Sequence, residues 1–253
     1  MKLSTIVING LTLLNAAMGI AAMIVLVMGP KMGWSGPFTL YVAAALITWG
    51  YVPDILDGVA ARAWKETSEI GAQLDVNADT TTFNLATALL VAAVPIYSMD
   101  VNPLKAPGRL TLGVVCAMVY ACAGLVRSAR LVVAESPEAP VGRYFYGFTT
   151  NGASLLTTAL VMVAYSLPYP DVTPWLYFAV PVLALLLAPL MVSRIAYPDV
   201  LQQLLKGVLP RWPLVLLFAS IPFVGVVVAW SGMLFLYGFL LPLAFAALRR
   251  PLR

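Results

Sequence analysis

Long apolar runs occupy most of this 253-residue chain, separated by short groups of glycine, proline and charged residues. Charged residues make up only 10% of the sequence, against about 25% in an ordinary soluble domain. So little polar material cannot cover the surface of a soluble fold of this size. The sequence therefore predicts an all-α, polytopic membrane protein and excludes a soluble enzyme, a disordered chain and a fibrous one.

We expect a bundle of about eight membrane-spanning helices, because one span needs roughly 20 apolar residues. The expected spans are 5–28, 37–56, 75–98, 110–133, 152–168, 173–195, 212–229 and 232–248. The chain contains no internal repeat and no low-complexity segment. We therefore expect a single domain over residues 1–253, in which 212–248 form extra packing helices.

The distribution of lysine and arginine predicts the orientation of these spans. With the N-terminus in the cytoplasm, 12 of the 15 basic residues fall on the inside and 3 on the outside. This asymmetry predicts a multi-pass protein of the cell (inner or plasma) membrane with both termini cytoplasmic. The net charge of +4 is then explained by loops that face anionic lipid, and no nucleic-acid partner is expected.

Cysteine and histidine offer little chemistry here. Cys116 and Cys122 lie in one apolar run without CxxC spacing, and we interpret them as small packing residues. The sequence contains no histidine, which is the commonest general base and transition-metal ligand. Any proton transfer or metal binding must therefore depend on carboxylates.

Four aspartates lie at the inner ends of the second and third expected spans: Asp54, Asp57, Asp75 and Asp79. Such charges are costly near hydrocarbon unless they are paired or hydrated, and close carboxylates repel one another. Spacings of three and four residues place each pair on one helix face. Two such faces could share divalent cations, and all-oxygen ligation favours Mg²⁺, Mn²⁺ or Ca²⁺. A lone aspartate would instead be interpreted as a helix cap, and the acids alone do not separate an enzyme from a cation transporter.

The residues between the acids complete a longer pattern over residues 54–79. It resembles the signature of the CDP-alcohol phosphotransferase family, DxxDGxxAR followed after eight residues by GxxxDxxxD. The resemblance implies two divalent cations, Mg²⁺ or Mn²⁺, with Asp54, Asp57 and Asp75 as ligands. It also implies that Asp79 is the general base and a further metal ligand. The residues implied to line the CDP site are Gly58, Ala61, Arg62, Gly71 and, as a weaker candidate, Thr12.

Further segments resemble the phosphatidylserine synthase branch of this family: residues 9–19, 127–131, 144–152 and 191–198. That resemblance implies transfer of a lipid phosphate from CDP-diacylglycerol, or CDP-archaeol, to L-serine, with release of CMP. Candidate groups for the serine carboxylate are Arg127, Arg130 and Arg143. The same arginines would suit glycerol phosphate or inositol phosphate, or serve only as positive-inside charges, so these alternatives stay open. A homodimer also stays open, and the cytoplasmic position of the acids favours an enzyme over a transporter.

Overall fold

Helices form nearly all of the structure, a computed structural model that describes residues 2–66, 68–98, 107–133, 144–166 and 173–198. In chain order the elements are α1 (Leu3–Met28), η1 (Pro30–Met32), α2 (Gly36–Trp64), α3 (Glu69–Asp79), η2 (Thr80–Ala86), α4 (Thr87–Tyr97), α5 (Pro107–Val133), β1 (Tyr144–Tyr146), α6 (Thr150–Ser166), α7 (Thr173–Val192) and β2 (Ala196–Pro198). The element η2 is a π-helical segment that joins α3 to α4 without a break.

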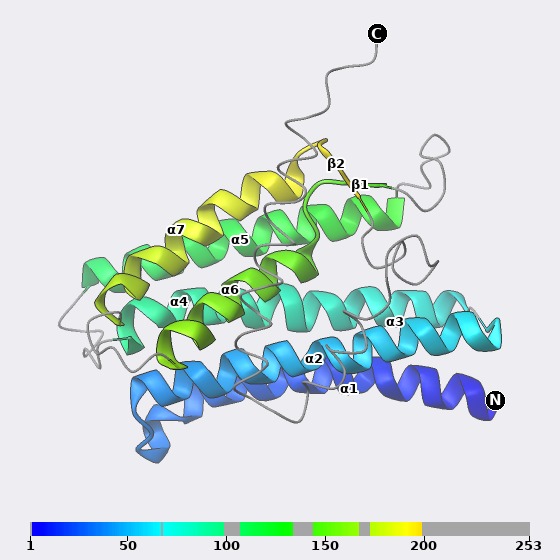
Figure 1. The fold of residues 1–253 in the computed structure, drawn as a ribbon, viewed down its shortest axis with the longest axis horizontal. Coiled ribbons are helices and arrows are strands. Elements are labelled where there is room, and N and C mark those ends of the chain that lie inside the picture. Colours follow the sequence, from blue (N-terminus) through cyan, green and yellow to red (C-terminus); the bar gives the residue numbers. More distant parts are fainter. Residues whose placement is uncertain (1, 67, 99–106, 134–143, 167–172, 199–253) are drawn as a thin grey trace, which may run out of the picture.

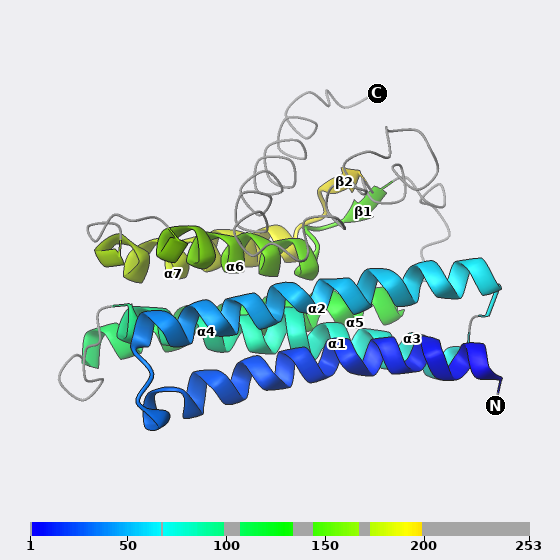
Figure 2. The ribbon, with the colours of Figure 1, turned by 60° about the horizontal axis from the view of Figure 1, so that its bottom comes forward.

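The helices run roughly side by side (Figure 1). Helix α1 packs along α2, and α4 packs along α5. Helices α6 and α7 form a second layer over these (Figure 2). The strands β1 and β2 pair antiparallel with Phe145 opposite Tyr197, so the chain that enters α6 lies beside the chain that leaves α7.

Among the described residues, four helical segments are long and apolar enough to cross a membrane: Leu3–Met28, Gly36–Trp64, Glu69–Tyr97 and Pro107–Arg130. They correspond to the first four expected spans. The fifth and sixth expected spans coincide with shorter apolar helices, Thr150–Ala164 and Phe178–Val192. The expected spans 212–229 and 232–248 lie outside the described residues, so the total of eight and the orientation stay predictions.

Two details of the expected fold need correction. The short β1–β2 ribbon was not expected in an all-α chain. In addition, α2 continues past residue 56 to Trp64, and α3 already begins at Glu69. The expected spans followed hydropathy, which falls where polar residues begin, whereas the backbone stays helical until Lys65 adopts a left-handed conformation (φ 53°). Asp54 and Asp57 therefore lie inside a helix and not at its end.

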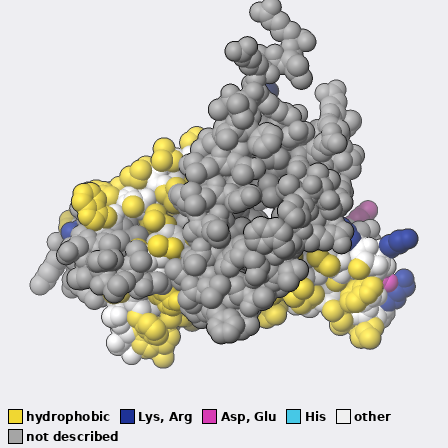
Figure 3. All heavy atoms as spheres, in the orientation of Figure 1, with side chains coloured by type: hydrophobic (Ala, Val, Ile, Leu, Met, Phe, Trp, Pro, Cys, Tyr) yellow, Lys and Arg dark blue, Asp and Glu magenta, His cyan; other side chains and the backbone are white. Residues whose placement is uncertain are grey.

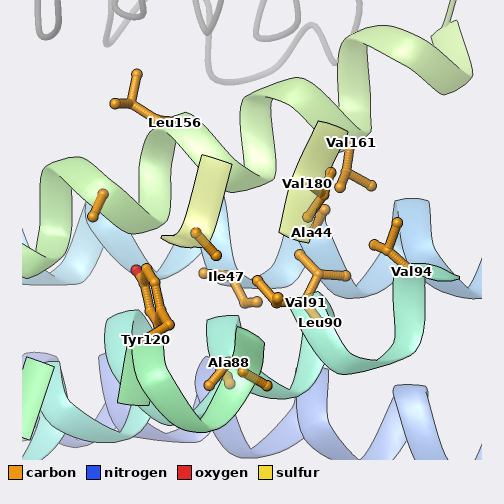
Figure 4. Close-up of a cluster of buried hydrophobic side chains, with 14 of the residues drawn as sticks. Ala44, Ile47, Ala88, Leu90, Val91, Val94, Tyr120, Leu156, Val161 and Val180 are labelled. Carbon is orange, nitrogen blue, oxygen red and sulfur yellow. The ribbon is translucent and has the colours of Figure 1, made fainter. Parts of the chain in front are cut away.

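The buried core joins α2, α4, α5, α6 and α7 (Figure 4). Its members include Ile47, Leu90, Tyr120, Leu156 and Val180, each exposed by 2% or less. Outward-facing residues are also apolar, for example on α1, and this suits contact with lipid. Because lipid is as apolar as the helices, close packing and polar contacts between helices must hold such a bundle together.

One such close contact joins α1 to η2. A Cβ atom on Gly19 would lie 2.5 Å from Thr82 Oγ1 and 2.6 Å from Thr82 Cα. The Thr82 hydroxyl donates to the carbonyl of Asn15 at 2.8 Å. On the other side of η2, the Tyr120 hydroxyl donates to the carbonyl of Phe83 at 3.3 Å. The π-helical turn is therefore held between α1 and α5, directly after Asp79.

We predict that Gly19→Ala lowers the stability of the bundle. The added methyl group has to push α1 away from η2, and such overpacking costs about 1–3 kcal/mol. Thermal unfolding of the purified protein in detergent measures the effect. The control is Gly10→Ala on the same helix, where nothing lies within 4 Å of the new Cβ. Equal melting temperatures for the two variants would contradict the close contact.

Candidate metal centre and active site

The candidate site is built where α2 and α3 bring three carboxylates together. One oxygen atom from each of Asp54, Asp57 and Asp75 lies within 4.8 Å of the other two. The left-handed Lys65 ends α2, and the Ser68 hydroxyl accepts the Gly71 N–H at 3.0 Å to start α3. Because the turn between α2 and α3 is short, the acids of these two helices lie close together.

The donor set fits a hard divalent cation. All its ligand atoms are carboxylate oxygens, which suit Mg²⁺, Mn²⁺ or Ca²⁺ better than softer metals. The carboxyl groups of Asp54 and Asp79 are also in direct contact, and Asp75 and Asp57 add to the repulsion at Asp54. A bound cation would relieve this repulsion. The expected convergence of Asp54, Asp57 and Asp75 thus agrees with the geometry.

Asp79 lies beside this cluster and is held by two amides. Its Oδ1 accepts the side-chain N–H of Asn15 at 3.1 Å, and its Oδ2 accepts that of Asn151 at 3.1 Å. Asn151 also donates to Oδ2 of Asp54 at 3.3 Å. Asn15 comes from α1 and Asn151 from the first turn of α6, so the site draws on four helices. Sequence reasoning missed both amides, although both lie within the segments of family resemblance.

Thr12 meets a metal-site carboxylate. Its hydroxyl donates to Oδ2 of Asp57 at 2.6 Å, and the two side chains are buried. Thr12 lies on the same buried face of α1 as Asn15. The contact assigns Thr12 to the support of Asp57, and its expected role in CDP binding stays a prediction.

The N-terminal end of α1 is fixed beside the α2–α3 turn by Glu66. Its carboxylate accepts hydrogen bonds from Ser4 and from Thr5, at 2.9 Å for Thr5, and pairs with Lys2 at 2.9 Å. Hydrogen bonds from Ser4, Lys2 and Thr5 lower the pKa of Glu66 to about 2. The carboxylate is therefore ionised throughout the physiological pH range, which keeps α1 in register with the turn.

The expected CDP-binding residues surround this turn. The exposed guanidinium of Arg62 lies over Gly58, where an added Cβ would be 3.5 Å from Nη2. A Cβ on Gly71 would lie 2.9 Å from the Ser68 hydroxyl, so the absent side chain leaves room for the helix cap. Ala61 is half-buried on α2. In Figure 3, charged side chains gather at this end of the molecule, near the N-terminus, and hydrophobic ones dominate the rest of the described face.

The three expected serine-binding arginines have different surroundings. Arg127 is 8% exposed, donates to the Thr150 hydroxyl at 3.4 Å and interacts electrostatically with Asp79. Within the described residues its Nε has no hydrogen-bond partner. Arg130 instead donates to the Val192 carbonyl at 2.6 Å, at the C-terminal end of α7. Arg143 lies outside the described residues.

The structure is thus that of a helical membrane protein in which carboxylates from two helices form one candidate metal centre. The chain belongs to the CDP-alcohol phosphatidyltransferase family, whose model matches residues 5–190 and so includes all four aspartates. It is similar to the CDP-diacylglycerol–serine O-phosphatidyltransferase of Bacillus subtilis (strain 168), with 29% identity over 97 residues. That alignment covers 38% of this chain and 49% of the relative, so the chain spans about half the length of the relative it matches. The family expected from the sequence is confirmed.

We predict that Thr12→Val weakens metal binding by about 10–100-fold, the usual cost of losing a hydrogen bond that orients a ligand. Valine keeps the shape but cannot donate to Asp57. Electron paramagnetic resonance of free Mn²⁺, titrated with purified protein, measures the affinity. The matched control is Thr39→Val, at a buried threonine whose hydroxyl donates to the Ser35 carbonyl one turn earlier. If Thr12→Val binds Mn²⁺ as tightly as the control, Asp57 is not a ligand that Thr12 supports.

Proposed function

We propose that this chain is a phosphatidylserine synthase, which transfers the phosphatidyl group from CDP-diacylglycerol, or its archaeol counterpart, to L-serine. The observation that carries the proposal is the convergence of Asp54, Asp57 and Asp75, in the order of the family signature. Family membership over residues 5–190 supports the transfer chemistry. The name of the Bacillus subtilis relative, together with the electrostatic interaction between the buried Arg127 and Asp79, supports serine as acceptor.

The metal ligands in this proposal are Asp54, Asp57 and Asp75, with Asp79 at their edge. Divalent cations bound there, Mg²⁺ or Mn²⁺ with Ca²⁺ as an alternative occupant, would neutralise negative charge on the CDP pyrophosphate. Arg62 adds a planar fork of donors for phosphate oxygens. Gly58, Ala61 and Gly71 would leave the surface of the helices low enough for the nucleotide to approach.

Asp79 is the proposed general base. The serine oxygen forms a new bond to the phosphorus of the phosphatidyl group, and the bond from that phosphorus to CMP breaks, so CMP leaves with the electron pair. The serine hydroxyl must lose its proton as it attacks, and in a chain without histidine a carboxylate is the natural acceptor. The two amide hydrogen bonds and the contact with Asp54 still leave lone-pair capacity on the Asp79 carboxylate for this proton.

Arg127 is the leading candidate for the serine carboxylate, with Arg130 and Arg143 as further candidates. Its buried guanidinium interacts electrostatically with Asp79 and can offer Nε together with a terminal nitrogen as a two-pronged donor. Binding the carboxylate there would place the serine hydroxyl near the proposed base. The reaction would take place on the cytoplasmic side of the cell membrane, where serine and CDP are dissolved while the acyl chains stay in the bilayer.

We predict that purified protein with Mn²⁺ releases CMP from CDP-diacylglycerol when serine is supplied, but not with glycerol phosphate or inositol phosphate. Arg127→Leu should raise the KM for serine about 10–100-fold, because a hydrogen bond to a charged group is worth roughly 1.5–3 kcal/mol. The control Arg127→Lys keeps the charge but loses the two-pronged geometry, so its KM for serine should lie between those of the parent protein and Arg127→Leu. Turnover with a phosphorylated polyol and none with serine would contradict the proposed acceptor. Absence of transfer to any acceptor would contradict the proposed activity.

A further inference from the structure

We infer that Asn151 is a positioning residue of this site, which holds the carboxylates of Asp54 and Asp79 in a fixed mutual orientation. The inference rests on the proposed function, since it assigns Asp54 to the metal and Asp79 to the proton. Neither the acid pattern nor the family signature over residues 54–79 includes this amide.

A single side-chain nitrogen makes both contacts. Nδ2 of Asn151 donates to Oδ2 of Asp79 at 3.1 Å and to Oδ2 of Asp54 at 3.3 Å. An amide has two N–H hydrogens, so each carboxylate receives one. The two carboxyl groups are in contact and repel each other. A neutral double donor is one of the few groups that can hold them together without adding a charge that competes with a metal.

The opposite side of Asp79 is held from α1. Asn15 is fully buried, and its side-chain N–H donates to Oδ1 of Asp79 at 3.1 Å, while its backbone carbonyl accepts from Thr82. Asp79 is thereby fixed at both oxygens, by amides on two helices that are far apart in the sequence. With both bonds in place the plane of the Asp79 carboxyl group is set, and Asn151 links that group to Asp54 in addition to their direct contact.

Hydrogen bonds fix the backbone on both sides of Asn151. The Thr149 hydroxyl accepts the Gly152 N–H at 3.0 Å, which caps the start of α6. The N–H groups of Gly147 and Phe148 donate to the carbonyls of Ile195 and Leu190, each at 2.9 Å. Gly147 has φ +77°, and a Cβ there would collide with the carbonyl of Met191. The first turn of α6 is therefore anchored to the end of α7, independently of the acids.

The same turn also reaches the acceptor side of the proposed site. Thr150, next to Asn151, accepts a hydrogen bond from Arg127 at 3.4 Å. Two successive residues thus contact the proposed serine-binding arginine and the proposed base. The start of α6 fixes the distance between the group that would bind the acceptor and the group that would take its proton.

Asn151→Leu tests the inference, because leucine has nearly the same size and cannot donate. We expect kcat to fall about 10–100-fold, and the affinity for Mn²⁺ to fall in the same range. At saturating Mn²⁺, the KM for CDP-diacylglycerol and for serine should change little, since the groups proposed to bind them remain. Asp79→Asn gives the comparison for loss of the base itself, about 10²–10⁴-fold in kcat. The matched control is Thr157→Val on α6, whose buried hydroxyl donates to the Ala153 carbonyl of its own helix.

The measured kcat, Mn²⁺ affinity and melting temperature decide whether Asn151 has a positioning role. A lower kcat and weaker Mn²⁺ binding in Asn151→Leu, with both unchanged in Thr157→Val, supports the positioning role. Values within twofold of the parent for both quantities overturn it, as does a lower melting temperature with unchanged kcat per folded molecule. If the parent protein transfers to no acceptor, the proposed function fails, and Mn²⁺ affinity alone still decides whether Asn151 orients Asp54.

Discussion

Repulsion among four carboxylates in a chain with few charges is the constraint on which the rest of the site depends. Asp54, Asp57, Asp75 and Asp79 cannot be placed together near hydrocarbon without groups that offset their charge. The structure supplies such groups from three other elements: Thr12 and Asn15 on α1, Asn151 on α6 and Arg127 on α5. Helices α1 and α6 therefore contribute hydrogen bonds to the acids, and α5 contributes a positive charge. The negative charge that remains on Asp54, Asp57 and Asp75 makes their carboxylate oxygens a donor set for a divalent cation.

These polar contacts also determine how closely the helices approach. Thr12 and Asn15 reach the acids because α1 lies tightly against η2. This close approach requires glycine at position 19, since Thr82 occupies the place of any side chain there. The π-helical turn lies immediately after Asp79, and π-bulges are frequent at functional sites because they redirect the residues around them. The close packing of α1 on η2 at Gly19 therefore also places the Thr12 and Asn15 side chains that bind the acids.

The acids and their pairing could be predicted from sequence because both depend on local spacing. Residues three or four apart on a helix share a face, and hydropathy located the first four long helices. The supporting amides could not be found in this way, since Asn15 and Asn151 are 64 and 72 residues from Asp79. Arg130 shows the same limit: its charge suggested an acceptor site, whereas its guanidinium donates to the end of α7. Hydropathy also placed the end of α2 too early, because a helix that leaves the apolar layer loses hydrophobicity before it loses its backbone hydrogen bonds.

Anomalous diffraction from crystals soaked with Mn²⁺ tests the central claim, that two helices build one metal centre. We expect anomalous density within coordination distance of carboxylate oxygens from Asp54, Asp57 and Asp75 together, with Asp79 at the edge of the metal centre. Density at only one of the two helices, or only at other acids such as Glu66 and Glu69, would contradict it.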